Sequence, residues 1–536
     1  MAFQHFPICL RPASGVNAPG YLRMNMVKTD RLVHFRRWLG PSFWLAVALT
    51  LGRITGLLRE VTVASKFGIS MEADIAVLLL ALPDVMVGLL VAGGISAAFV
   101  PQLNARDADE GKVLIRFTAI VIAGIFGLIG LLFAISPQAI FLLLAPGNRE
   151  LADAVPQGLA LLIGLSLPIA ALTGVLGGYH NANGRFFVVG AGTLVFNIAI
   201  IAILLGSTGL LQPMTALAFG ILGGVTARLL LQLKGVPADV IGRKILPSDW
   251  KRYLGDFSAG LLATGIGILA PVAVRAWASF FGPGSVATVN YAQKLVELPT
   301  GVLFGALCTV ALSEMSKANA RNDHADATML FAKYVRIVVL LGCVATVVCM
   351  GLSRQISEIV FSYGAINESD ISKVSDFFFI AAISIPLTGI SLIFISYYMA
   401  LKLSRQVLVL SLISFPALML ACFTFYYVDS FVLLPFALVV HQIVLVSILY
   451  FRSEIDLKSI ISGDFAKLLL YAVSPLIAAA AMGRYLEGIG LVFSLGGFGA
   501  AMLVSAVIVS RLWPRGFGDL DRATSGMSLR NDGQFR

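Results

Sequence analysis

The chain has 536 residues, of which 58% are hydrophobic and only 13% are charged, and its formal net charge is +10. Soluble domains are about a quarter charged, so this composition excludes an ordinary soluble enzyme and indicates a protein that is solvated by lipid. The mean hydropathy of +0.90 agrees with this assignment. The excess of lysine and arginine could indicate a nucleic-acid partner. These residues lie between hydrophobic segments in a pattern typical of membrane topology, however, so we expect no nucleic-acid binding.

Hydrophobic segments recur along the sequence at the length that crosses a bilayer. About 20 apolar residues span the roughly 30 Å of hydrocarbon as a helix, and a helix satisfies all of its backbone polar groups within one segment. We therefore predict an all-α polytopic membrane protein with about fourteen transmembrane helices. The predicted spans are 41–65, 74–100, 113–135, 153–179, 186–206, 213–233, 257–282, 291–313, 330–352, 376–400, 406–426, 431–451, 466–486 and 489–512.

The lysines and arginines outside these spans predict the topology. If the N-terminus lies in the cytoplasm, nearly all of them fall in segments on the cytoplasmic side, as the positive-inside rule requires. We therefore expect both termini in the cytoplasm and a multi-pass chain in the lipid bilayer. The cations that remain on the other side are Lys66, Arg149, Arg354, Lys373 and Arg484.

The sequence also contains an internal repeat. Landmarks in the first half recur 216 to 218 residues later: Leu82-Pro83 as Leu298-Pro299, Ser166-Leu167-Pro168 as Ser384-Ile385-Pro386, and Gly147 as Gly364. A repeat of six helices keeps the same orientation in both halves, so we predict two six-helix pseudo-repeats plus two C-terminal helices.

The predicted organisation follows from these repeats. It consists of a polar basic cytoplasmic leader (1–40), a first lobe (41–233), a basic cytoplasmic linker (234–256), a second lobe (257–451), helices 13 and 14 (452–512) and a cytoplasmic tail (513–536).

Several ionisable side chains lie within the predicted spans. Such residues are costly in a bilayer and usually face a bundle interior or a watery cavity. The equivalent first helices of both repeats carry an arginine. The residues singled out are Arg53, Arg59 and Glu60 in the first helix, Asp74 at the start of the second, Arg275 in the seventh, and Lys294 and Glu297 in the eighth.

Cations that converge on a cavity between two lobes would suit a polyanionic ligand. Guanidinium binds a phosphate through two parallel charge-assisted hydrogen bonds, and a neighbouring carboxylate can hold the cation in place. On this hypothesis the substrate-binding residues are Arg53, Arg59, Asp74, Arg275 and Lys294, supported by ion pairs with Glu60 and Glu297.

The alternative is a purely structural role. The spacing of Arg53 and Glu60, and of Lys294 and Glu297, places each pair on one face of its helix. Such pairs could simply lock helices together.

The sequence lacks the common motifs of soluble enzymes. It contains no Walker A, H-E-x-x-H or G-x-S-x-G motif, and its five cysteines lack metal-binding spacing. We expect no enzymatic activity, metal or cofactor. Transport would then draw on a coupling ion, the membrane potential or the substrate's own gradient.

Two blocks of sequence resemble the MurJ (MviN) family of lipid II flippases, which belongs to the multidrug/oligosaccharidyl-lipid/polysaccharide exporter superfamily. The resemblance covers the chain from about residue 40. The first block comprises 52–60, 64–68, Ala73-Asp74, Leu82-Pro83 and 97–101, and the second comprises 278–280, 284–286, 291–295, Glu297 and 299–303. Weaker similarities are Asn183 to Phe186, Asn197 and Tyr363-Gly364.

The resemblance implies a fold and a function. Two lobes would open alternately to each side of a bacterial inner membrane. A cationic central cavity would bind the diphosphate of an undecaprenyl-linked saccharide, and helices 13 and 14 would form a groove for the lipid tail. The family's functional arginines in the first helix correspond to Arg53 and Arg59, and its aspartate in the second corresponds to Asp74.

The sequence departs from the family pattern in the second and eighth helices. Val87 and Gly88 stand where the family has two arginines, and Ala92 where it has a glutamate. Gln293-Lys294 replaces an Asp-Arg pair, which keeps the charge but loses the guanidinium fork. Either Arg275 compensates for the lost arginines, or the cargo differs from lipid II.

Three functions therefore remain open. The leading hypothesis is a flippase for lipid II or for an exopolysaccharide precursor, with glycan-assembly proteins as further partners. The second is a cation-coupled exporter of small molecules from the same superfamily, for which acidic cavity residues would be expected. The third is a non-transporting scaffold in glycan assembly.

Overall fold

The computed structural model describes residues 41–237, 246–453, 455 and 477, and the described residues form helices and turns without any strand. The predicted leader, the tail and nearly all of the segment expected to form helices 13 and 14 lie outside the described residues. The helices are long because the sequence offers apolar runs with few breakers, and lipid leaves the backbone no other way to satisfy its polar groups.

The first half of the chain forms lobe 1. Its long helices are α2 (Pro41–Phe67), α3 (Met71–Leu90), α5 (Ala108–Ile135), α8 (Gln157–Ala182), α9 (Phe186–Gly206) and α10 (Pro213–Leu233), and its short ones are α4 (Val100–Ala105), α6 (Pro137–Leu144) and α7 (Glu150–Asp153). A π-helical segment, η1 (Val91–Phe99), connects α3 to α4.

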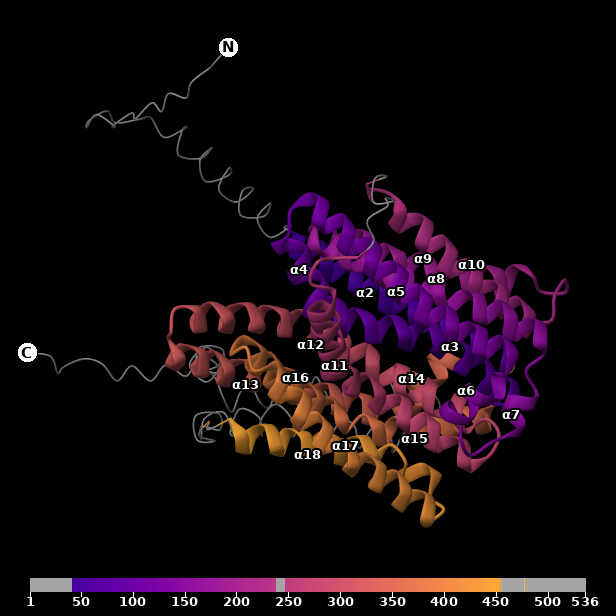
Figure 1. Cartoon of the computed structure of the whole chain (residues 1–536). Coiled ribbons are helices and arrows are strands. Elements are labelled where there is room, and N and C mark those ends of the chain that lie inside the picture. The colour runs from indigo at the N-terminus through magenta and orange to yellow at the C-terminus, as the bar shows by residue number, and fades with distance from the viewer. Residues whose placement is uncertain (1–40, 238–245, 454, 456–476, 478–536) are drawn as a thin grey trace, which may run out of the picture.

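The second half forms lobe 2. It contains α11 (Trp250–Ala278), η3 (Ser279–Phe281), α12 (Ser285–Ala320), α13 (His324–Gly351), α14 (Ser353–Phe361), α15 (Glu368–Ala381), α16 (Ser384–Ala400), α17 (Ser404–Tyr427), η4 (Phe431–Leu433) and α18 (Phe436–Arg452). In Figure 1 lobe 1 runs from indigo to magenta and lobe 2 from pink to yellow, with α2, α11 and α12 where the two lobes meet.

The first twelve predicted spans each coincide with a helix or with consecutive helical segments, and 186–206 and 213–233 have the bounds of α9 and α10. Within the described ranges, nine helical stretches are long and apolar enough to cross a membrane, or up to eleven if two bent pairs each count as one span. α2, which has 27 residues and carries charged side chains, is not among them. The all-α membrane fold is confirmed, while the count of fourteen stays a prediction.

The two lobes share one packing plan. In lobe 1, α8 packs against α3, α5 and α10, and in lobe 2 the equivalent helix α16 packs against α12, α13 and α18. The pairs α2–α9 and α9–α10 recur in the same way as α11–α17 and α17–α18. These matching neighbours support the two six-helix pseudo-repeats deduced from the sequence landmarks.

Two of the helices that line the interface between the lobes are bent, and they pack against each other. The chain leaves helical geometry at Gly93 in η1 (φ −94°, ψ −106°), and α11 bends by 52° between its segments 250–262 and 267–281. α11 packs closely along η1, and a Cβ at Gly94 would collide with the Phe257 ring. Glycine at position 94 therefore permits the close packing of η1 against α11, because it has no side chain.

The bundle has two distinct ends. We call the end with the loops that carry Arg106, Arg185, Lys234, Arg321 and Lys402, and with Arg252 in the first turn of α11, the basic end, and the other the distal end. At the distal end the lobes meet through backbone groups and one serine hydroxyl. Ala365 N donates to Ser65 O at 2.8 Å, and Gly147 N donates to Ser279 Oγ at 2.8 Å.

The two repeat landmarks Gly147 and Gly364 lie at these distal contacts, in reciprocal positions. A Cβ on Gly147 of lobe 1 would collide with the Phe280 backbone of lobe 2, and a Cβ on Gly364 of lobe 2 would collide with Ser65 O of lobe 1. Gly364 also has φ +71°, which favours glycine. The lobes can approach this closely because neither glycine has a side chain.

At the basic end the lobes meet through side chains. Arg106 Nη2 donates to Asp249 Oδ1 at 2.5 Å, and Gln102 Nε2 donates to Asp256 Oδ2 at 3.3 Å. The buried hydroxyls of Thr118 and Tyr253 lie 2.7 Å apart. Contacts between the lobes are therefore present at both ends of the bundle.

We predict that Gly364→Ala weakens the distal contact and lowers the unfolding temperature of the purified protein. The substitution adds a left-handed backbone penalty of about 1 kcal/mol and a collision with Ser65 O. Gly209→Ala is the matched control, because Gly209 has φ +83° but no atom within 4 Å of its Cβ position. Equal losses in both variants would show that the distal contact contributes nothing.

Candidate functional site

A polar cavity lies between the lobes and is divided into two adjoining pockets of about 440 and 270 Å³. Both pockets are lined by Arg59, Asp84, Lys294 and Glu297. The larger one extends past α2 and α12 to Asn197 of α9 and Thr388 of α16, and the smaller one reaches Arg275 of α11. Charged residues from four helices, α2, α3, α11 and α12, therefore face one space.

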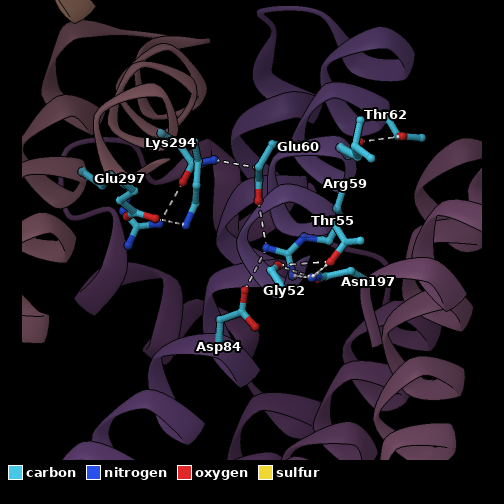
Figure 2. A network of polar contacts seen from close by, with 12 residues as sticks. Gly52, Thr55, Arg59, Glu60, Thr62, Asp84, Asn197, Lys294 and Glu297 are labelled. Carbon is cyan, nitrogen blue, oxygen red and sulfur yellow. Dashed lines mark hydrogen bonds and ion pairs between the residues drawn. The ribbon is translucent and has the colours of Figure 1, made fainter. Parts of the chain in front are cut away.

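Arg59 is the centre of the polar network. Its Nη2 donates to Glu60 Oε1 and to Asp84 Oδ2, both at 2.8 Å, and its Nη1 donates to Asn197 Oδ1 at 3.2 Å (Figure 2). The guanidinium carbon also lies 5.6 Å from the centroid of the Phe196 ring. Arg59 is only 4% exposed, and two carboxylates compensate its buried charge.

The network crosses from lobe 1 to lobe 2 through an asparagine. Asn290 Nδ2 donates to Glu60 Oε2 at 2.8 Å, and Asn290 Oδ1 accepts from Arg275 Nη1 at 3.1 Å. The same glutamate that binds Arg59 in α2 is thereby connected to α12 and α11. The positions of Arg59 and Arg275 depend on each other through this chain of hydrogen bonds.

Lys294 and Glu297 form an ion pair at 2.7 Å, as their spacing of three residues suggested. The other suggested pair, Arg53 with Glu60, does not form, because Glu60 is bound by Arg59 and Asn290. Arg53 instead donates from Nη1 to the carbonyl oxygen of Gly301. Its guanidinium lies over Gly301 and Gly305 of α12, where any Cβ would contact it.

Asp74, which the sequence analysis grouped with the cavity residues, lines neither pocket. Its carboxylate is fully buried and accepts hydrogen bonds from Gly284 N and Ala287 N, both at 2.7 Å. These amides belong to the N-terminus of α12, which has no side-chain cap of its own. A carboxylate from lobe 1 therefore caps a helix of lobe 2 at the distal end, with the sign that the helix dipole favours.

Two site residues were missed in the sequence analysis. Asp84 follows the Leu82-Pro83 landmark inside a predicted span, so the rule that selected Arg59 would also have selected it. Asn290 carries no charge, and no sequence pattern marks it. Asn197 was noted only as a weak similarity, although it binds Arg59 and also donates to Gly52 O and Thr55 Oγ1 (Figure 2).

Two of the four cavity cations, Arg53 and Arg275, form no ion pair with any residue that the structure describes. All three cavity carboxylates accept hydrogen bonds from Arg59 or Lys294. Arg53 and Arg275, by contrast, donate to neutral oxygens, and Arg275 Nε is buried without a partner. No group of three or more His, Cys, Asp or Glu side chains that could hold a metal ion occurs in the part of the chain that the structure describes. The free binding capacity of the cavity is thus cationic.

Comparisons with known proteins agree with the resemblance. The family model "Lipid II flippase MurJ" matches residues 63–502. The lipid II flippase MurJ of Burkholderia cenocepacia is 26% identical over 358 residues, which cover 64% of this chain and 69% of that protein. The probable lipid II flippase MurJ of Thermotoga maritima is 27% identical over 348 residues, which cover 63% of this chain and 70% of that protein.

Solved structures share the fold. A lipid II flippase MurJ in an inward closed conformation matches with a TM-score of 0.73 and 20% identity, over 88% of this chain and 99% of that one. An inward-facing multidrug transporter of the MATE family matches with a TM-score of 0.60 and 13% identity, over 76% of this chain and 99% of that one. Since the family model covers most of the sequence, this membrane protein belongs to the MurJ family of lipid II flippases.

Proposed function

We propose that this protein is a transporter that moves a saccharide, linked through a diphosphate to an undecaprenyl carrier, across the bacterial inner membrane. The observation that carries the proposal is the pair Arg53 and Arg275. These guanidiniums come from different lobes, border adjoining pockets and bind only neutral oxygens in the protein. The curated relatives are named as lipid II flippases, which supports the same class of cargo.

A diphosphate diester carries one negative charge on each phosphate, so two guanidiniums match it in number. Each can form a bidentate pair with one phosphate. The ligand would replace the Gly301 and Asn290 oxygens as hydrogen-bond acceptors without breaking any ion pair. The ion pairs of Arg59 and Lys294 would keep the surrounding helices in place during this exchange.

Arg275 supports lipid II as an acceptable cargo despite the lost family arginines. Its pocket includes Ala81, Asp84 and Val85 of α3, the helix on which the family arginines would stand at positions 87 and 88. The Cβ position of Gly88 lies 3.8 Å from the side chain of Ile268, so residue 88 faces α11. Arg275 thus supplies a cation from α11 to the side of the cavity where α3 lacks one. An exopolysaccharide precursor with the same diphosphate linkage is the second candidate cargo.

The contacts at the two ends support alternating access. Opening at the distal end would require separation of Asp74 from the α12 N-terminus and of Ser65 from Ala365. Opening at the basic end would require separation of Arg106 from Asp249. We place the basic end and both termini in the cytoplasm by the positive-inside rule, and a coupling ion or the membrane potential would drive the cycle.

A cation-coupled exporter of small molecules is the alternative that the MATE-like fold suggests. The carboxylates such an exporter would need are present in the cavity, but each is already bound by a protein cation. This pairing favours the anionic cargo. A non-transporting scaffold would not require Arg53 and Arg275 to face a cavity.

The direct test is complementation of a bacterium depleted of its own lipid II flippase. Rescue by this chain would identify lipid II as an accepted cargo. If the protein reaches the membrane and cells still lyse, lipid II is not its cargo, and precursors from neighbouring glycosyltransferase genes become the next substrates to assay.

We predict that Arg59→Ala abolishes rescue while the protein remains in the membrane fraction. The substitution leaves Glu60 and Asp84 without their cation, and loss of one partner from a buried ion pair costs about 3–5 kcal/mol. Arg321→Ala serves as the control, since Arg321 is an exposed residue paired with Asp326 at the basic end. Full rescue by a well-folded Arg59→Ala variant would contradict the proposed cavity.

We further predict that Arg53→Gln and Arg275→Gln each weaken binding of undecaprenyl diphosphate to the purified protein by about 10- to 100-fold. A charge-assisted hydrogen bond is worth about 1.5–3 kcal/mol, and 1.4 kcal/mol corresponds to a tenfold change in affinity. Because both residues bind only neutral groups in the protein, the variants should fold. Unchanged affinity in both would remove the argument for a diphosphate.

We predict that Asp249→Asn increases the fraction of molecules that are open at the basic end by about fivefold. The reason is that a partly exposed ion pair contributes roughly 1 kcal/mol to the closed form. The readout is the rate at which a thiol reagent modifies a cysteine introduced at Gly56, which lines the larger pocket. The hydrogen bond from Arg106 lowers the pKa of Asp249 below its usual value. The carboxylate therefore stays charged between about pH 5 and 8. The thiolate fraction of the introduced cysteine rises with pH in both proteins, so the quantity to follow is the ratio of the variant rate to the wild-type rate, which should be constant over this range. A ratio that falls toward 1 at pH 5 would contradict a charged Asp249 as the group that holds this closure.

A further inference from the structure

The central cavity is lined by more positive than negative side chains. The linings of its two pockets include four cations and three carboxylates, namely Arg53, Arg59, Arg275 and Lys294 against Glu60, Asp84 and Glu297. One positive charge is therefore in excess within this lining. A single further carboxylate beside Arg275 would cancel the excess and would give Arg275 an ion pair.

Asn290 of α12 occupies the position where such a carboxylate would stand. It is 3% exposed and lines the smaller pocket, between Glu60 of α2 and Arg275 of α11. Its Nδ2 donates to Glu60 Oε2 at 2.8 Å, and its Oδ1 accepts from Arg275 Nη1 at 3.1 Å. These two contacts fix the orientation of the amide, because a carboxylate only accepts hydrogen bonds and a guanidinium only donates them.

A neutral side chain with one donor and one acceptor satisfies both neighbours. Glu60 binds Arg59 through Oε1, and the Asn290 amide supplies the donor for its second oxygen. An aspartate has the same shape, but it would pair with Arg275 and face Glu60 as a like charge. An anionic ligand would then compete for Arg275 with a carboxylate, which binds a guanidinium more strongly than an amide oxygen does.

We propose that Asn290 makes the cavity selective for an anion. As a neutral spacer between a carboxylate and a guanidinium, it holds Arg275 at the smaller pocket and keeps Arg275 from pairing with a carboxylate. The inference rests on the proposed function and extends it, because it assigns the charge selectivity for the cargo to one uncharged residue.

The test is binding of undecaprenyl diphosphate to the purified full-length protein and to two variants with opposite expected effects. We choose about pH 8, because two neighbouring carboxyl groups can share a proton at lower pH. Asn290→Asp should bind about 10- to 100-fold more weakly than the wild type, the range set by the loss of one charge-assisted hydrogen bond. Asn290→Leu should bind at least as tightly as the wild type, because the ligand then displaces no acceptor from Arg275.

Thermal unfolding of the same samples separates charge selection from structural support. Without ligand, Asn290→Leu should unfold at a lower temperature than the wild type, because Glu60 loses a donor and Arg275 an acceptor. Undecaprenyl diphosphate should raise its unfolding temperature at least as much as that of the wild type. A residue needed only for packing would weaken binding in both variants. A tenfold loss of affinity in a folded Asn290→Leu variant would therefore overturn the proposal, whether or not Asn290→Asp folds.

Asn319→Asp is the matched control, because it makes the same chemical change in the same helix. Asn319 donates to Ala400 O at 3.1 Å and lines neither central pocket, so this variant should bind like the wild type. If Asn319→Asp loses as much affinity as Asn290→Asp, or if Asn290→Asp loses none, the role of Asn290 is overturned while the diphosphate site stands. If the wild type itself binds no undecaprenyl diphosphate, the proposed site is overturned, and the role of Asn290 with it.

Discussion

The buried ion pairs of Arg59 with Glu60 and Asp84 are the interaction on which the central site depends. A guanidinium that is 4% exposed inside a membrane protein is tolerated only where carboxylates compensate it. Because Glu60 also accepts from Asn290, which in turn accepts from Arg275, this one charge cluster aligns α2, α3, α11 and α12. The same four helices contribute the charged residues that line the cavity. The side chains that align the helices therefore border the space that a ligand would occupy.

The cations of the site fall into two groups according to their partners. Arg59 and Lys294 are bound to carboxylates and hold helices, whereas Arg53 and Arg275 are bound to neutral oxygens and remain available. An anionic ligand that displaces a neutral acceptor leaves every ion pair intact. The energetic barrier to exchange is therefore lower than it would be if the ligand had to compete with a buried carboxylate. The same low barrier would favour release of the proposed cargo.

The sequence predicted the helices much better than the side-chain contacts. The spans were readable because the length and hydropathy of a membrane helix are set by the bilayer, independently of its neighbours. The partner of a charge depends instead on which helix faces it. Arg53 and Glu60 share a helix face, yet α12 brings Gly301 to the first and Asn290 to the second. Asp74 likewise caps α12 because two segments 210 residues apart meet, a contact that no local pattern encodes. Asp84 could have been found, since it is ionisable and lies within a span.

The two closures differ in the kind of group that forms them. The distal closure uses backbone groups, the Ser279 hydroxyl and a buried carboxylate. The basic closure has a buried pair of hydroxyls, Thr118 and Tyr253, but also the ion pair of Arg106 with Asp249, whose side chain is 41% exposed. Dissolved salt screens exposed charges over about 10 Å at 0.1 M but leaves buried hydrogen bonds largely unaffected. If the protein alternates between two openings, as proposed above, ionic strength acts mainly on the basic end. Preparations of the protein in dilute and in concentrated buffers would then contain different mixtures of the open and closed forms, even with the same ligand present.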